Sequence, residues 1–140
     1  MKTFYPFVSA CFLLISQLGF SQLWNGTISS DWNTAANWTP NNVPGTSSAV
    51  TINNAAATYQ PVLAGNVNIA SLNMSQGILN LAGFNLTCSG HAILTGDSLF
   101  NGKITALTFD NVANMHMGGK IILEKTGASN EFWAGSNKFY

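Results

Sequence analysis

The sequence predicts an all-β protein, specifically a right-handed parallel β-helix or β-solenoid, with a β-sandwich as the alternative fold. Five glycines recur at intervals of six or seven residues between Gly77 and Gly102. The pieces between them are short and apolar, long enough for strands and too brief for helices. Because glycine adopts positive φ without steric cost, each glycine is expected to form a corner between short strands. Corners repeated this regularly, without long loops, indicate stacked strands.

Residues 1–21 are expected to be a signal peptide. Lys2 supplies a positive charge, and an apolar stretch runs from Phe7 to Leu18. Small residues, Gly19 and Ser21, occupy the positions that favour cleavage before the following glutamine. The apolar stretch is shorter than the roughly 20 residues that span a bilayer. We therefore expect a protein that is secreted or located at the outer cell surface, with no transmembrane segment after cleavage.

Composition narrows the classes of function. The chain of 140 residues has five Lys, no Arg and five acidic residues. Nucleic acid requires a basic face to neutralise its phosphates, so no nucleic-acid partner is expected. Cys88 is the one cysteine beyond the expected leader, which leaves no internal disulfide and suggests a small buried residue. Seventeen asparagines suit the turns and ladders of layered β-structure.

Residues 22–64 are expected to form an N-terminal capping region. Three tryptophans, Trp24, Trp32 and Trp38, fall within fifteen residues there. Bulky rings suit the end of a solenoid, where one face has no neighbouring turn to cover it. The alternative is a carbohydrate-binding platform in which these three rings stack on sugars. Asp31 is expected to cap a turn with its carboxylate.

Residues 65–140 are expected to form the solenoid repeats, after an earlier strand at 49–52. Strands are predicted at 67–74, 78–81, 84–88, 92–94, 103–109 and 120–124. Inward-facing leucines are expected to form a continuous core, namely Leu81, Leu86, Leu94, Leu107 and Leu123. The last residues, Lys138 to Tyr140, contain no turn or polar tail. We therefore expect the chain to be the N-terminal part of a longer molecule, whose open C-terminal edge self-associates when isolated.

Several motifs resemble a known class of proteins. They are Trp24-Asn25-Gly26, Asp31-Trp32, Asn37-Trp38, Val43-Pro44, the segment from Gly90 to Ala106, and the tail from Glu124 to Phe139. These motifs are similar to large secreted surface proteins of Gram-negative bacteria that use the type IX secretion route. The resemblance implies an adhesin-like β-solenoid stalk with a sorting domain at the far C-terminus; none is visible in this sequence. Asp97-Ser98-Leu99 is similar to the O-glycosylation signal of such bacteria, which makes Ser98 a candidate modification site.

Catalytic chemistry is weakly represented. Polysaccharide-cleaving β-helix enzymes need clustered acids, whereas Asp97 and Asp110 are expected to serve turns. His91 and His116 lack partners at zinc-ligand spacing, so no metal, cofactor or catalytic residue is expected. The predicted function is a structural or adhesive surface protein, non-catalytic in this segment, with surface polysaccharides or cell glycans as possible partners. The alternatives are a carbohydrate-binding module and part of a polysaccharide-cleaving enzyme.

Overall fold

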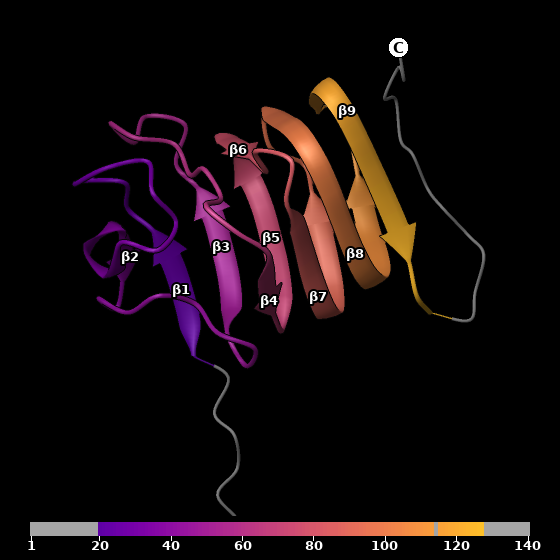
Figure 1. Cartoon of the computed structure of the whole chain (residues 1–140), viewed down its shortest axis with the longest axis horizontal. Coiled ribbons are helices and arrows are strands. Elements are labelled where there is room, and N and C mark those ends of the chain that lie inside the picture. Colours follow the sequence, from indigo (N-terminus) through magenta and orange to yellow (C-terminus); the bar gives the residue numbers. More distant parts are fainter. Residues whose placement is uncertain (1–19, 114, 128–140) are drawn as a thin grey trace, which may run out of the picture.

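Parallel strands stacked side by side build the protein, as Figure 1 shows for β3, β5, β7, β8 and β9. The computed structural model describes residues 20–113 and 115–127, which form a β-solenoid of about four turns. The elements are β1 (Ser21–Trp24), a 3-10 helix (Ala35–Asn37), β2 (Trp38–Thr39), β3 (Ala49–Asn53), β4 (Val67–Ile69), β5 (Ser71–Gln76), β6 (Ile78–Asn80), β7 (Asn85–Leu94), β8 (Ser98–Val112) and β9 (His116–Lys125). The expected all-β fold and solenoid architecture are confirmed.

Apart from β2, which pairs antiparallel with β1, the strands fall into three columns, each made of segments from successive turns. Column A contains β1, β3, β5 and the later parts of β7 and β8. Column B contains β6 and the first parts of β8 and β9. Column C contains β4, the first part of β7, the middle of β8 and the end of β9. Along the chain, segments of columns A, B and C follow one another in this order. The long strand β8 contributes one segment to each column and so forms three sides of the solenoid.

The length of one turn explains the glycine spacing. Paired residues one turn apart differ by 18 positions for Leu86 and Ile104, and by 20 for Asn80 and Phe100. An interval of six or seven residues is therefore one side of a three-sided turn. The predicted segments 78–81, 84–88 and 92–94 each lie on one such side. The predicted segment 67–74 divides into β4 and β5 on two sides, and β7 and β8 continue through their corners as longer strands.

The glycine corners are of two kinds. Gly83 and Gly102 occupy the corner between columns B and C in successive turns, and both have positive φ, +88° and +154°. Gly90 and Gly96 also lie at corners, but the expectation of positive φ there is wrong. Close packing accounts for these two glycines instead. A Cβ on Gly90 would lie 3.1 Å from the Ala70 carbonyl oxygen, and one on Gly96 would lie 2.9 Å from the Met74 side chain.

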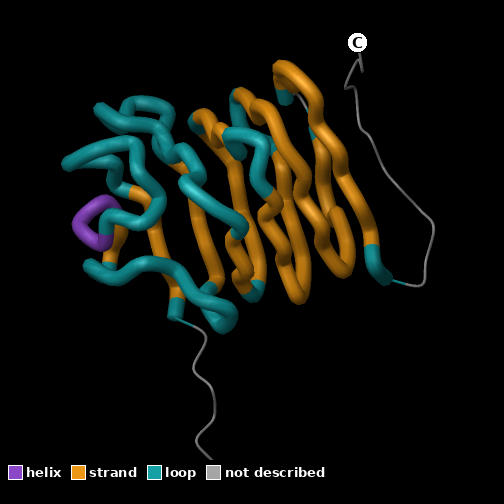
Figure 2. Tube along the Cα trace, in the orientation of Figure 1, coloured by secondary structure: helices purple, strands orange, loops and turns teal. Residues whose placement is uncertain are grey.

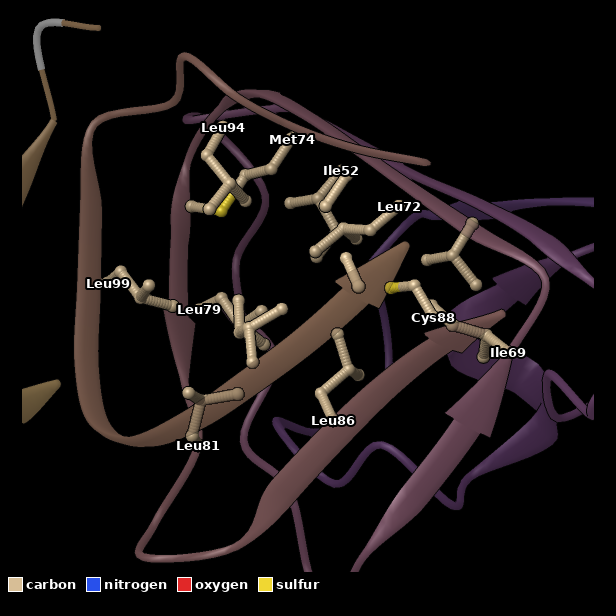
Figure 3. Packing of buried hydrophobic residues seen from close by; sticks show 14 of the residues in the cluster. Ile52, Ile69, Leu72, Met74, Leu79, Leu81, Leu86, Cys88, Leu94 and Leu99 are labelled. Atoms are coloured by element: carbon tan, nitrogen blue, oxygen red, sulfur yellow. The ribbon is translucent and has the colours of Figure 1, made fainter. Parts of the chain in front are cut away.

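The core is a continuous apolar column inside the turns. Figure 3 shows Ile52, Leu72, Met74 and Leu94 projecting into the enclosed space together with Leu79, Leu81, Leu86 and Leu99. Each fully buried side chain of this size contributes roughly 1.5–3 kcal/mol by removal from water. The stack is thus held together by packing between turns as well as by ladder hydrogen bonds.

One predicted core residue is wrongly assigned. Leu107 is 42% exposed, whereas Ala106 and Phe109 on either side of the corner are buried. The strand bends between columns C and A at this point, and the pairing register with β7 shifts between Cys88 and His91. The bend breaks the simple alternation of inward and outward side chains on which the assignment depended. Leu123 packs against the core only partly buried.

The N-terminal end is covered by a cap of loops, which gather at the end opposite β9 (Figure 2). Trp24, Trp32 and Trp38 are each 1% exposed and join the core there. Asp31 caps the turn that follows it, because its Oδ1 accepts from the Asn33 backbone N–H at 2.9 Å. The Trp-rich cap is therefore present, although β1 and β3 in the same region already pair in parallel as solenoid strands.

Asn37 organises the polar side of the cap. Its side chain is fully buried, and Oδ1 accepts from the backbone N–H groups of Ile28 and Ser29, both at 3.0 Å. Its Nδ2 donates to Ser29 Oγ at 3.1 Å and to the Asp31 carbonyl at 3.0 Å. A buried carboxamide with all of these bonds fixes the loop that precedes the second tryptophan.

The expected signal peptide lies mostly outside the described residues. Ser21, its last residue, is the first residue of β1 and pairs with Ala49. The Phe20 carbonyl accepts from the Ala49 backbone N–H at 3.0 Å. Cleavage before Gln22 would remove these two contacts and leave the rest of β1 paired.

We expect Cys88 to be chemically inert in the folded protein. Burial in the core raises the pKa of its thiol to about 12, so the reactive thiolate is scarce near neutral pH. An alkylating reagent should modify Cys88 only after unfolding. Peptide mass spectrometry of labelled protein, before and after denaturant, separates Cys88 from Cys11; rapid labelling of native Cys88 would contradict its position in the core.

Candidate functional site

An open groove of about 410 Å³ crosses the corner between columns B and C near the β9 end. It is lined by Gly83, Asn85, Asn101, Gly102, Lys103, Lys120 and Ile122. These residues come from the last three turns, on β7, β8 and β9 and the corner before β7. The groove therefore exists only because turns distant in sequence are stacked.

The strand register places the lining side chains in a row across the turns. Asn85 pairs with Lys103, and Lys103 pairs with Ile122. Neighbouring parallel strands lie about 4.8 Å apart, so these side chains are close neighbours on one surface. The corner beside them is left-handed in successive turns, with φ of +50° at Ala82, +48° at Asn101 and +72° at Gly119.

The groove is positively charged. It contains two lysines and no acidic residue among its lining. Lys103 Nζ lies 2.9 Å from Glu124 Oε2, which also accepts from Thr105 Oγ1 at 3.1 Å. The Lys103 hydrogen bond, followed by the one from Thr105, lowers the pKa of the Glu124 carboxyl. Lys120, in contrast, makes no ion pair with any residue in the described ranges.

The two asparagines of the groove have unused hydrogen-bonding groups. Within the part of the chain that the structure describes, neither the Asn85 nor the Asn101 carboxamide makes a hydrogen bond. Each carboxamide offers donors and acceptors. The groove therefore combines an unpaired ammonium group, amide groups and the exposed apolar side chain of Ile122.

The tryptophans predicted as a carbohydrate platform have a different role. The ring of Trp38 meets those of Trp24 and Trp32 edge to face, with centroids 4.9 and 4.7 Å apart. A sugar platform needs exposed, roughly coplanar rings, and these three are buried at 72–82° to their neighbours. They offer no face to a sugar, so carbohydrate contact through Trp24, Trp32 and Trp38 is not supported by this geometry.

Ser98, the candidate O-glycosylation residue, opens β8 and is half-buried in column B. Its neighbour Leu99 points into the core. The carboxylate of Asp97 accepts from the Gly77 backbone N–H at 2.8 Å, which links two turns at a corner. Asp97 thus has the structural role of a turn residue, while glycosylation of Ser98 stays a prediction.

His91 and Asp110 form an exposed cluster with Thr108. His91 Nδ1 lies 2.8 Å from both Thr108 Oγ1 and Asp110 Oδ2. A relay for nucleophilic catalysis needs the hydroxyl and the carboxylate on opposite ring nitrogens, and here both meet the same nitrogen. His116 pairs with Ser98 and its ring stacks edge to face on Phe100, so the two histidines have different surroundings.

The free energy of unfolding should decrease at acidic pH, in part because the Asp110 carboxylate becomes protonated. Hydrogen bonds from Thr108 and then His91 lower the pKa of its carboxyl, so the folded state binds this proton less readily than the unfolded chain. The contribution of Asp110 to stability is present above its pKa of 3.8 in the unfolded chain. It is lost as the pH falls through the lower pKa of the folded state. Denaturant midpoints measured from about pH 5 downwards should decline, and less steeply for Asp110→Asn. An identical slope in both proteins would contradict this role; the effect is small because the pair is exposed.

The described residues contain no cluster of three or more His, Cys, Asp or Glu side chains suited to a metal ion. Asp97 and Asp110 contact different partners, and neither lines the groove. In the described part of the chain, Asp97 and Asp110 therefore do not form the cluster of acids that a polysaccharide-cleaving enzyme would need. The described residues also contain no helix with the length and apolar character needed to cross a membrane.

Comparison with known proteins identifies a family. The sequence matches the family described as "Domain of unknown function (DUF8693)" over residues 23–129, which is most of the chain. The protein belongs to this family. The matched segment begins in β1 and extends beyond β9, so it covers the cap and all the described turns. No curated protein and no solved structure matches the chain.

Sequence reasoning missed the groove. Asn85, Lys103 and Ile122 are 18 and 19 positions apart, which equals one turn, but the glycine spacing alone gave only the length of a side. Aligning the sequence on the full turn would have brought these residues into one row.

Proposed function

We propose that this protein is a secreted or cell-surface β-solenoid with a structural and adhesive role, non-catalytic in this segment. The observation that carries the proposal is a regular stack of turns with a continuous apolar core, covered at one end by the Trp cap. Such a stack is stiff along its axis, because each turn packs on its neighbours, and suits a spacer that holds a binding surface away from the cell.

The β9 end supports this role. Among the described strands, β9 pairs only with β8, and its inward residues Met117, Ile121 and Leu123 are only partly buried. A further turn of the same kind would cover them and pair with β9 on the side opposite β8. The type IX secretion route and the signal peptide at residues 1–21 belong to the same proposal.

Localisation tests the proposal. The full chain, expressed in its native bacterium, should be degraded when intact cells are treated with a protease that cannot enter them, and antibodies to the cap should label those cells. A cytoplasmic marker protein serves as the control and should survive. Protection of both proteins in intact cells would refute a surface location.

Self-association provides a second test, of the open edge. The protein without residues 1–21 should form larger species at high concentration through β9, since an unpaired strand edge templates pairing. Ile122→Lys places a charge beside that edge on an exposed position and should suppress the association. Thr51→Lys, on β3 between β1 and β5 and away from β9, is the matched control. Light scattering that shows only monomers of the unaltered protein would contradict association through β9.

A further inference from the structure

We propose that the groove of Asn85, Asn101, Lys103, Lys120 and Ile122 binds an acidic polysaccharide through its uronate carboxylates. The assignment deepens the proposed adhesive function and rests on it, because an extracellular polymer reaches only an exported protein. The Trp cluster takes no part in this binding, since its rings are buried.

Charge favours an anionic ligand. The described residues include three lysines, and two of them line this groove. Lys120 has no anionic partner among the described residues, and Lys103 shares only one of its three N–H donors with Glu124. A ligand carboxylate would complete the coordination of both ammonium groups with charge-assisted hydrogen bonds.

The remaining lining favours a sugar over other anions. The Asn85 and Asn101 carboxamides can donate to and accept from hydroxyl groups, which present both functions. Ile122 offers an apolar surface for the C–H face of a sugar ring. Nucleic acid is a poorer fit, because the groove contains no aromatic ring for base stacking and no arginine.

The shape favours a polymer. The groove is open and crosses three turns, so its polar groups repeat along the stack at about the strand spacing of 4.8 Å. A chain of sugars can lie along this row and place successive groups against successive turns. A solenoid extended by further turns would continue the same surface.

Titration calorimetry with polygalacturonic acid tests the assignment on the purified protein. Methyl-esterified polygalacturonic acid is the matched ligand, since it keeps the sugar backbone and removes the charge. We expect binding of the acid that weakens with added salt, and at least tenfold weaker binding of the ester. Equal affinity for acid and ester would overturn a carboxylate site.

Two variants locate the binding. Lys120→Gln should weaken binding about tenfold, the equivalent of about 1.4 kcal/mol. Lys125→Gln removes the same charge from the same strand outside the groove and should leave affinity unchanged. Asn101→Gly removes the carboxamide at a left-handed position that glycine tolerates, so it should weaken binding and preserve the fold.

The outcomes separate this assignment from the proposed function. Equal losses in Lys120→Gln and Lys125→Gln, or binding of dextran sulfate as tight as that of the uronate polymer, would show non-specific charge attraction and refute the groove. No binding of the acid would also refute it, yet would leave a surface location measured by protease treatment intact. A cytoplasmic location combined with groove-dependent binding would refute the surface role alone.

Discussion

Trp38→Ala should destabilise the protein by about 3–5 kcal/mol, the range for removing a large aromatic side chain from a core. Trp38 is the central ring of the cap and contacts both Trp24 and Trp32. Its loss would leave a cavity beside these two rings, which belong to the same buried cluster. Denaturant unfolding followed by far-ultraviolet circular dichroism gives the change in free energy without relying on tryptophan fluorescence.

Phenylalanine replacements provide the matched comparison. Trp38 Nε1 donates to the Trp32 carbonyl at 2.8 Å, and Trp24 Nε1 donates to the Tyr59 carbonyl at 2.8 Å. Trp32 Nε1 is buried and has no partner among the described residues. Trp32→Phe loses no such bond, so it should cost less than Trp38→Phe by about 1 kcal/mol. The reverse order would mean that the indole N–H groups do not stabilise the cap as described.

Gly102→Ala should be the most damaging of the corner substitutions, by about 3 kcal/mol. A Cβ at this position would lie 2.5 Å from Leu81 Cβ and 2.6 Å from the Phe84 carbonyl oxygen, so the turns on either side would have to separate. Gly83 occupies the equivalent corner one turn earlier, where a Cβ would meet no atom within 4 Å. Gly83→Ala should therefore cost only about 1 kcal/mol, for its left-handed backbone.

Thermal unfolding of the two variants distinguishes packing from backbone conformation as the reason for glycine at this corner. Similar losses of stability in Gly83→Ala and Gly102→Ala would indicate that glycine is needed at this corner only for its backbone conformation. A loss of stability in Gly102→Ala alone would indicate that glycine is needed only for close packing. Gly90→Ala should fall between Gly83→Ala and Gly102→Ala, since its Cβ would be 3.1 Å from a carbonyl oxygen that can move slightly.

The sequence was sufficient to predict the class of fold, because corner residues and short apolar segments are local signals. Buried Leu81, Leu86 and Leu94 followed from the same alternation. The exposure of Leu107 could not be predicted in this way. Strand β8 continues through a corner there, so the positions that face the core shift, and no glycine or proline marks the bend. The length of a turn was also missed, because it depends on how many sides close the coil.

Side-chain function was harder to predict than the fold. Three clustered tryptophans look the same in sequence whether their faces are exposed or packed edge to face. The groove draws on residues between Gly83 and Ile122, and none of them is unusual on its own. Only the register between turns brings Asn85, Lys103 and Ile122 together.

The Trp cap covers one end of the described stack, so we expect unfolding to begin at the other end. Each inner turn is stabilised by its two neighbours, and β9 pairs with one described strand, β8, whereas β5 pairs with both β3 and β7. We therefore expect fraying of the described stack to begin at β9 and to travel toward the tryptophans, so that amide hydrogen exchange is faster in β9 than among the middle turns. A pulling force applied along the axis would release turns one at a time from that end, and the molecule would lengthen in steps while its capped end stayed folded.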